Sequence, residues 1–130
     1  MSRRFTRHYS REEAKALLPE VRKWLGELVD TRDRLGRFDK RLKGLMVEGA
    51  DVGGEAVGGY LSNFVRFREL LGEFRSREIQ LKDLDRGLVD FPAIYQGREV
   101  FLCWEVGEDD IEHWHELDGG FAGREPLEGF

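Results

Sequence analysis

Apolar side chains recur every three or four residues through the first third of the chain, which is the pattern of an amphipathic helix. Two heptad columns run from residue 14 to residue 45, and nine of their ten positions are apolar. The columns contain Ala14, Val21, Leu28, Leu35 and Leu42, and Leu17, Trp24, Thr31, Phe38 and Leu45. Just before them, Ser10 and Glu13 have the spacing of a capping box. The pattern predicts a first helix over residues 10–47.

A second set of apolar columns predicts another long helix, over residues 59–87. Its regular members are Val57, Tyr60, Phe64, Phe67, Leu71, Phe74, Leu81 and Leu88. Glu78 and Asp85 interrupt one column, and Gly87 suits a left-handed helix cap. Five glycines between residues 49 and 59 mark a flexible connection, which we place at residues 48–58. Two such helices with a short link predict an antiparallel helical hairpin.

Beyond Gly87 the heptad pattern stops and β-forming residues replace it. The three strand candidates are Ala93–Tyr95, Arg98–Val106 and Ile111–Leu117, with Gln96-Gly97 as a tight turn between the first two. We therefore predict a small three-stranded antiparallel β-meander over residues 88–118 and an irregular tail over residues 119–130. Residues 1–130 are predicted to form a single α+β domain, in which the long helical hairpin precedes the meander.

Composition agrees with one domain whose helices have long solvated faces, because 36% of the 130 residues are charged. The net charge of -5 argues against a nucleic-acid partner, but it hides a division of the chain. Residues 1–47 carry 13 Lys or Arg against 7 Asp or Glu, and residues 48–130 carry 8 against 19. We expect the two parts to attract each other, within the fold or across a dimer. The alternative is that the basic first helix holds an anionic ligand.

Features that the sequence lacks limit the cellular location that we expect for the protein. No apolar run is long enough for a membrane span, and the first residues lack the apolar segment of a secretory signal. The single cysteine, Cys103, excludes an internal disulfide. These features predict a cytoplasmic protein.

The aromatic residues of both helices favour self-association. They are Trp24, Phe38, Phe64, Phe67 and Phe74. Two helices alone do not cover so many large side chains, whereas a homodimer with a four-helix arrangement does. The first functional hypothesis is therefore a non-enzymatic scaffold or interaction module that self-associates through its helices. An unidentified protein partner remains open.

His113 and His115 lie two residues apart on a predicted strand, so both side chains share one face. Such a pair can bind a divalent metal, of which zinc is the first candidate. On the neighbouring strand Cys103 and Glu105 also share a face, and they complete a metal site if the two faces coincide. Strand register decides this, and the sequence does not supply it. The alternative is a pair of histidines that are simply hydrogen-bonded. No cofactor is assured by any motif.

No catalytic signature is present. The glycines near residue 55 lack the lysine of a phosphate-binding loop. Cys103 lies between Leu102 and Trp104, which is typical of a buried and unreactive thiol.

Two long stretches, Leu81–Trp104 and Gly107–Leu127, resemble the prokaryotic family known as domain of unknown function 2203. Phe5-Thr6, Glu12–Ala14 and Leu17–Glu20 also resemble its opening. The family has no assigned function, so the resemblance implies no catalytic residue. It does imply a set of polar positions: Asp83, Asp85, Arg86, Asp90, Glu108, Trp114, His115, Asp118 and Arg124. His113 falls outside that set, which shifts the emphasis to His115 acting with acidic residues.

The second functional hypothesis is accordingly a polar site around His115 that binds a metal or an anion, with or without catalysis. Its candidate residues are His115, Glu116, Asp118, Arg124, Asp85, Arg86 and Asp90. Asp85 and Asp90 could act as acid and base, or could bind backbone amides at the junction between helix and sheet. Arg86 and Arg124 could hold an anion or pair with acidic side chains.

Overall fold

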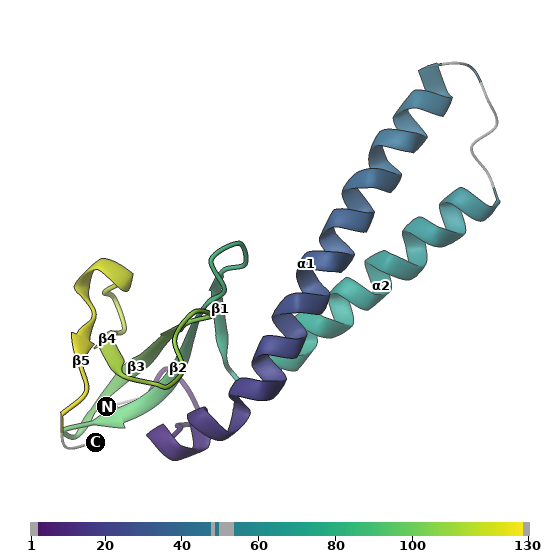
Figure 1. The fold of residues 1–130 in the computed structure, drawn as a ribbon. Helices are drawn as coiled ribbons and strands as arrows, with labels where there is room; N and C mark the ends of the chain where they lie inside the picture. The colour runs from purple at the N-terminus through teal and green to yellow at the C-terminus, as the bar shows by residue number, and fades with distance from the viewer. Residues whose placement is uncertain (1–2, 48, 50–53, 129–130) are drawn as a thin grey trace. The chain divides into compact units, whose positions relative to one another are not determined.

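The computed structural model describes residues 3–47, 49 and 54–128, and it divides into two compact units. The first unit comprises Met1–Lys23 with Phe74–Phe130, and the second comprises Trp24–Glu73. Two α-helices and a five-stranded antiparallel sheet are the main elements (Figure 1). The predicted α+β class is confirmed.

Helix α1 spans Arg11–Val47, in agreement with the predicted first helix. The capping box is present, because the Ser10 amide donates to Glu13 Oε1 at 3.0 Å and the Glu13 amide donates to Ser10 Oγ at 3.1 Å. These bonds lower the pKa of Glu13. Within the described residues, no helix combines the length and apolar character needed to cross a membrane.

Helix α2 spans Glu55–Arg75, so the predicted range of 59–87 is wrong at both ends. Its start lies inside the predicted connection at 48–58, of which residues 48 and 50–53 fall outside the described residues. Its end is a left-handed cap at Glu78, which has a φ of 59°. The Ile79 amide donates to the Phe74 carbonyl at 3.0 Å and the Glu78 amide to the Arg75 carbonyl at 3.1 Å, which closes the last turn.

The sheet has five strands, in the order β1-β2-β3-β4-β5, where three were predicted. The strands are β1 (Gln80–Asp83), β2 (Leu88–Tyr95), β3 (Arg98–Glu105), β4 (His113–Glu116) and β5 (Glu125–Pro126). Strand β1 arises where the second helix was expected to continue. Strand β5 arises in the expected irregular tail, where the 3-10 turn η1 (Phe121–Gly123) precedes it. Both differences reflect pairing with a neighbouring strand, which a short segment gains only in the folded chain.

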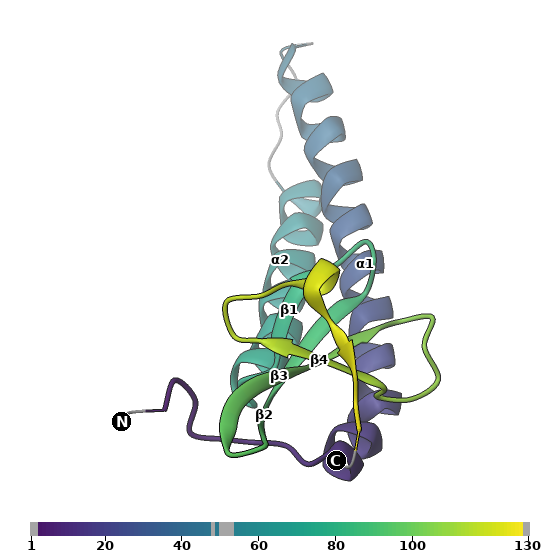
Figure 2. The same ribbon diagram turned by 90° about the vertical axis from the view of Figure 1, so that its left-hand side faces the viewer.

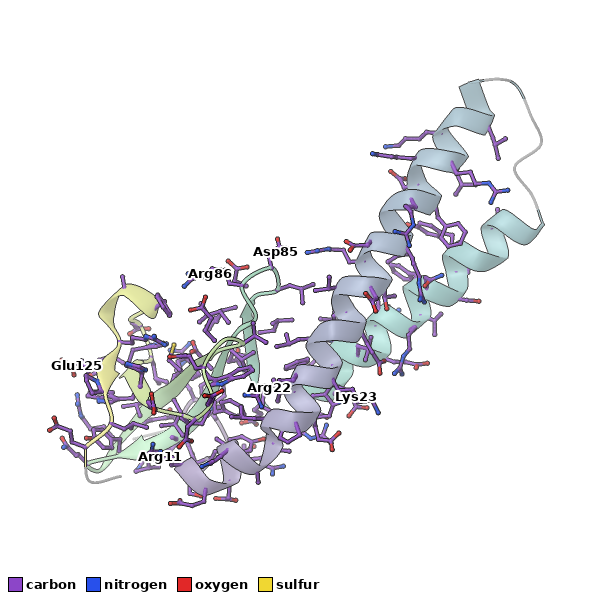
Figure 3. All side chains as sticks on the ribbon, in the orientation of Figure 1. Arg11, Arg22, Lys23, Asp85, Arg86 and Glu125 are labelled. Atoms are coloured by element: carbon purple, nitrogen blue, oxygen red, sulfur yellow. The ribbon has the colours of Figure 1, made fainter. Side chains whose placement is uncertain are left out.

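The turns on either side of β2 need residues that tolerate positive φ. Gln96 and Gly97 have φ values of 53° and 77°, so the predicted two-residue turn is confirmed. Gly87 is also left-handed, with a φ of 63°, but it ends the β1–β2 turn and not a helix. An added Cβ there would lie 2.6 Å from the Val106 Cβ, so a side chain would not fit without movement. Figure 3 shows Asp85 and Arg86 at the same turn.

The first unit packs its apolar core on one face of the sheet. The buried sheet residues of this face are Val89, Phe91, Ala93, Val100, Leu102 and Trp104. Tyr9 packs edge-on against Phe91 at 5.5 Å between ring centroids, and the Arg22 guanidinium of α1 lies 5.2 Å from the Trp104 ring. Strand alternation then places a second set of side chains, including Asp90 and Cys103, on the opposite face.

The segment before α1 is held to the first unit by two carboxylates. The amides of Arg4 and Phe5 donate to Glu99 at 2.7 and 3.1 Å, and His8 Nε2 lies 2.6 Å from the same carboxylate. The Thr6 amide donates to Glu78 at 2.9 Å. Figure 2 shows this segment running beside the sheet before α1 begins.

Basic side chains near the amino terminus pair with the acidic end of the chain. Arg11 and Lys15 lie 3.3 and 3.4 Å from Asp110. Arg4 lies 3.3 Å from Asp118. The predicted attraction between the two charge segments is thus present within the first unit.

Side-chain contacts join the two helices of the second unit, and two of them are as follows. Arg66 of α2 forms an ion pair with Glu27 of α1. Gly59 of α2 faces Phe38 of α1 so closely that an added Cβ would lie 2.7 Å from the Phe38 Cζ. Buried residues of this unit include Leu25, Leu28, Thr31 and Leu70.

Acid should loosen the segment before α1. Hydrogen bonds from Thr6 and Arg7 lower the pKa of Glu78, and bonds from His8 and two amides outweigh burial and lower the pKa of Glu99. Their stabilisation is therefore present above the ordinary carboxyl pKa and is lost as the pH falls through the lowered values. A Glu78→Gln, Glu99→Gln double variant should show a lower Tm at pH 7 and an acid-induced decrease in Tm reduced by about half.

The matched control is Asp109→Asn, since Asp109 is exposed and makes no hydrogen bond or ion pair with another described residue. Its Tm profile between pH 7 and pH 3 should follow that of the unmodified protein. An acid-induced decrease of equal size in the double variant would contradict the assignment.

Candidate functional site

Strand register gathers the candidate polar side chains on the face of the sheet opposite the apolar core. Asp90 of β2 pairs with Cys103 of β3, which pairs with His113 of β4. His115 pairs with Phe101 in the next row. The histidine face and the Cys103 face therefore coincide, which is the condition that the sequence left open.

His115 and Asp90 form a buried pair across the intervening strand β3. His115 Nε2 lies 3.0 Å from Asp90 Oδ2, and the side chains are only 2% and 3% exposed. The other ring nitrogen, Nδ1, donates to the Glu116 carbonyl at 2.7 Å. Because β2 and β4 are not neighbours in the sheet, this pair ties together strands that no backbone hydrogen bond joins directly.

The surroundings of His115 favour its charged form. Burial lowers its pKa, but hydrogen bonding to Asp90, the nearby Cys103 and the Glu116 carbonyl outweigh burial and raise the pKa to about 10. We infer that the His115 imidazole is protonated at neutral pH. Phe101 packs beside this imidazole at 5.6 Å between ring centroids, which helps to keep water away.

Cys103 joins this pair to form a compact group of metal-binding side chains. Donor atoms of Asp90, Cys103 and His115 all lie within 4.8 Å of one another, and all three residues are buried. Asp90 Oδ1 has no hydrogen-bond partner although it is buried. A buried carboxylate oxygen without a partner is costly, so it marks a place where another group would be stabilised.

A second polar group surrounds Glu108, in the loop between β3 and β4. Arg124 donates to Glu108 Oε1 at 2.9 Å, and the Glu105 amide donates to the same atom at 2.8 Å. Burial opposes the charged carboxylate, but these bonds outweigh it and lower the pKa of Glu108. His113 Nδ1 lies 3.4 Å from Glu108 Oε2, although the geometry is not that of a hydrogen bond. Both groups border Cys103, which together with Glu108 raises the pKa of Arg124 against the opposing effect of burial.

The family resemblance pointed to Glu108, but the candidate residues around His115 did not include it, and Arg22 was not singled out at all. Arg22 donates from α1 to the Glu108 carbonyl at 3.0 Å. The available signal was the spacing between Glu105 and Glu108, which permits a side chain to cap the turn after a strand.

Two predicted site residues lie apart from His115. The side chain of Glu116 projects to the other face of β4 and pairs with Arg98 at 2.6 Å. Only its backbone carbonyl reaches His115. Asp118 is fully exposed and pairs with Arg4.

The turn residues form a separate cluster. Arg86 donates two hydrogen bonds to the Glu105 carboxylate, each 3.2 Å long, so Glu105 is not among the three clustered donors. Arg86 and Arg124 both lie 4.2 Å from the Phe121 ring centroid. Asp85 is exposed at the β1–β2 turn (Figure 3). Among the described residues, each of these two arginines has an acidic partner.

Replacement of His115 by alanine should cost about 3–5 kcal/mol of unfolding free energy, because it leaves the Asp90 carboxylate buried and unpaired. The double variant Asp90→Val, His115→Leu should recover most of this loss, since it removes both charges and replaces them with apolar side chains of similar volume. Urea unfolding in the presence of a chelator measures both quantities. A double variant as unstable as His115→Ala would mean that the pair does not act as a charged unit.

Comparison with known proteins identifies the family of the chain. No curated protein and no solved structure matches the chain significantly. The match is to a family model described as an uncharacterized conserved protein, and it extends over residues 7–127, which include the His115 site, the Glu108 group and both helices. The chain therefore belongs to the DUF2203 family of uncharacterized conserved proteins.

Proposed function

We propose that the protein is a non-enzymatic scaffold or interaction module that forms a homodimer through its helices. The observation that carries the proposal is an apolar stripe on α2 within the second unit. Leu61, Phe64 and Val65 are 54%, 42% and 52% exposed. Their spacing places them on one side of the helix. Large exposed apolar groups at such spacing are typical of an interface.

The stripe lies away from the neighbouring helix of the same unit. At 3.6 residues per turn, Gly59 and Leu70 lie on the other side of α2 from Val65. Gly59 faces Phe38 of α1, and Leu70 is fully buried. A second copy of the chain is the partner we propose for the stripe, because the second unit carries 8 Lys or Arg against 9 Asp or Glu and would not repel its own copy.

We further propose that the two helices of the second unit form the antiparallel hairpin. The two contacts between them support this arrangement, since Glu27 pairs with Arg66 while the later Phe38 faces the earlier Gly59. A four-helix dimer then needs only a second hairpin against the exposed stripe. A cytoplasmic location is part of the proposal, supported by the free and buried Cys103.

The hairpin predicts energetic coupling between Phe38 and Gly59. Gly59→Val should lower the Tm, because its side chain must displace the Phe38 ring. In a Phe38→Ala background the same substitution should cost less, since the ring is gone, and the two losses should fail to add. Thermal unfolding of the four proteins in this cycle gives the coupling. Strict additivity would argue against helix packing at this point.

The dimer predicts a change in mass when charge is placed on the stripe. The unmodified protein should sediment as a dimer at micromolar concentration. Val65→Glu should raise the dissociation constant of the dimer at least about tenfold, so that the variant sediments mainly as a monomer. Analytical ultracentrifugation over a range of concentrations measures this.

Gly26→Glu is the matched control. It adds the same charge to α1, at an exposed position where an added Cβ meets nothing within 4 Å. It should remain dimeric. A monomeric unmodified protein, or equal effects of the two substitutions, would remove the proposal.

A further inference from the structure

We propose that Asp90, Cys103 and His115 bind a divalent transition metal ion, with zinc as the best fit. One ligand comes from each of the three central strands β2, β3 and β4. Carboxylate oxygen, thiolate sulfur and imidazole nitrogen are all ligands that zinc accepts. The site lies in the sheet unit and is independent of the association proposed for the helices.

The distances suit a single ion. Zinc bonds of about 2.0–2.3 Å place two tetrahedral ligand atoms about 3.3–3.8 Å apart. The donor atoms of the three residues lie within 4.8 Å of one another, and His115 Nε2 is 3.0 Å from Asp90 Oδ2. Side-chain rotations that move the donor atoms by about 1 Å therefore suffice to bring all three onto one ion.

The orphaned Asp90 oxygen is an independent observation that points to a ligand. Oδ1 is buried without a partner while Oδ2 already faces His115. A metal ion beside the carboxylate would satisfy this oxygen or its neighbour. Solvent does not reach it readily, because Asp90 is only 2% exposed.

The hydrogen bonds of His115 are those of a metal ligand. Its Nδ1 donates to the Glu116 carbonyl at 2.7 Å, which fixes the ring and leaves Nε2 directed toward Asp90 and Cys103. Metal-bound histidines commonly hold their second nitrogen in this way. His113 lacks such an arrangement, since its Nδ1 lies beside Glu108 without a hydrogen bond.

Charge balance also suits a doubly charged ion. Zinc binding displaces the Nε2 proton of His115 and the proton of the Cys103 thiol, and an Asp90 carboxylate, a Cys103 thiolate, a neutral His115 and one zinc ion then sum to zero net charge. Burial strongly disfavours net charge, and all three residues are buried. A monovalent cation would leave the site negative, and the soft sulfur ligand disfavours calcium or magnesium.

The experiment measures metal content and cobalt spectra of the full chain. Protein produced with zinc in the medium and passed through gel filtration should contain one zinc per chain by elemental analysis. Cobalt added to chelator-stripped protein should give the near-ultraviolet absorption of a thiolate-to-cobalt transition. Cys103→Ser should abolish this absorption and weaken zinc binding by on the order of 100-fold or more, while its circular dichroism stays that of a folded protein.

His8→Gln is the matched control, because His8 also pairs with a carboxylate, that of Glu99, but lies outside the three donors. It should bind zinc as the unmodified protein does. Absence of zinc and of the cobalt absorption in the unmodified protein would overturn the proposal. So would a Cys103→Ser variant that binds zinc as tightly as the unmodified protein. Both outcomes leave the dimer test unaffected.

Discussion

The buried pair of His115 and Asp90 imposes the strictest constraint on the sheet. Two charges with side chains 2% and 3% exposed are tolerated only when they meet, since an isolated buried charge costs several kcal/mol. The partners lie on β2 and β4, so β3 must hold both neighbours in one register for the contact to form. A slip of β4 by one residue would turn His115 to the other face and leave Asp90 alone. The pair therefore specifies one arrangement of the three central strands.

The chain termini complete the polar face that this register creates. Phe5 packs against Phe101 at 5.4 Å between ring centroids, and Arg124 approaches from the carboxyl-terminal segment to Glu108. The basic residues before and within the start of α1 meet the acidic β end. The uneven charge along the chain thus helps to hold distant segments to the sheet. Each exposed ion pair contributes little to stability, and the backbone amides that donate to Glu78 and Glu99 add to it.

Capping and turn signals in the sequence were reliable, whereas the apolar columns extended the second helix too far. The capping box at Ser10 and the turn at Gln96-Gly97 depend on residues close in sequence, and both are present. Strands β1 and β5 form because a neighbouring strand pairs with them, so no local sequence pattern predicts them. Glu78 was noticed as a break in an apolar column, but helix propensity alone did not reveal that it ends α2 in a left-handed conformation.

The candidate site likewise has features that local sequence predicts and features that depend on strand register. His115 and Asp90 were both chosen, but their contact depends on register, which joins residues 25 positions apart. Glu116 was chosen as well, although strand alternation alone places its side chain on the face opposite His115. Period-two geometry was enough to avoid that error. The position of Cys103 beside Asp90 and His115 depends on strand register, so it was not predictable from the sequence.

The energetics of the apolar stripe limit how strongly two copies can associate. Full burial of a Leu, Val or Phe side chain contributes about 1.5–3 kcal/mol, and the three stripe residues are already about half buried. Six such side chains from two copies therefore supply about 5–9 kcal/mol, which is comparable to the cost of association, about 4–15 kcal/mol. The stripe alone does not sustain a tight dimer. Tyr60, stacked on Phe64 with the ring centroids 6.5 Å apart, extends the apolar surface along α2. A homodimer that persists at micromolar concentration would therefore need this wider apolar surface of α2 as well as the stripe, and a charge placed within the stripe would weaken it.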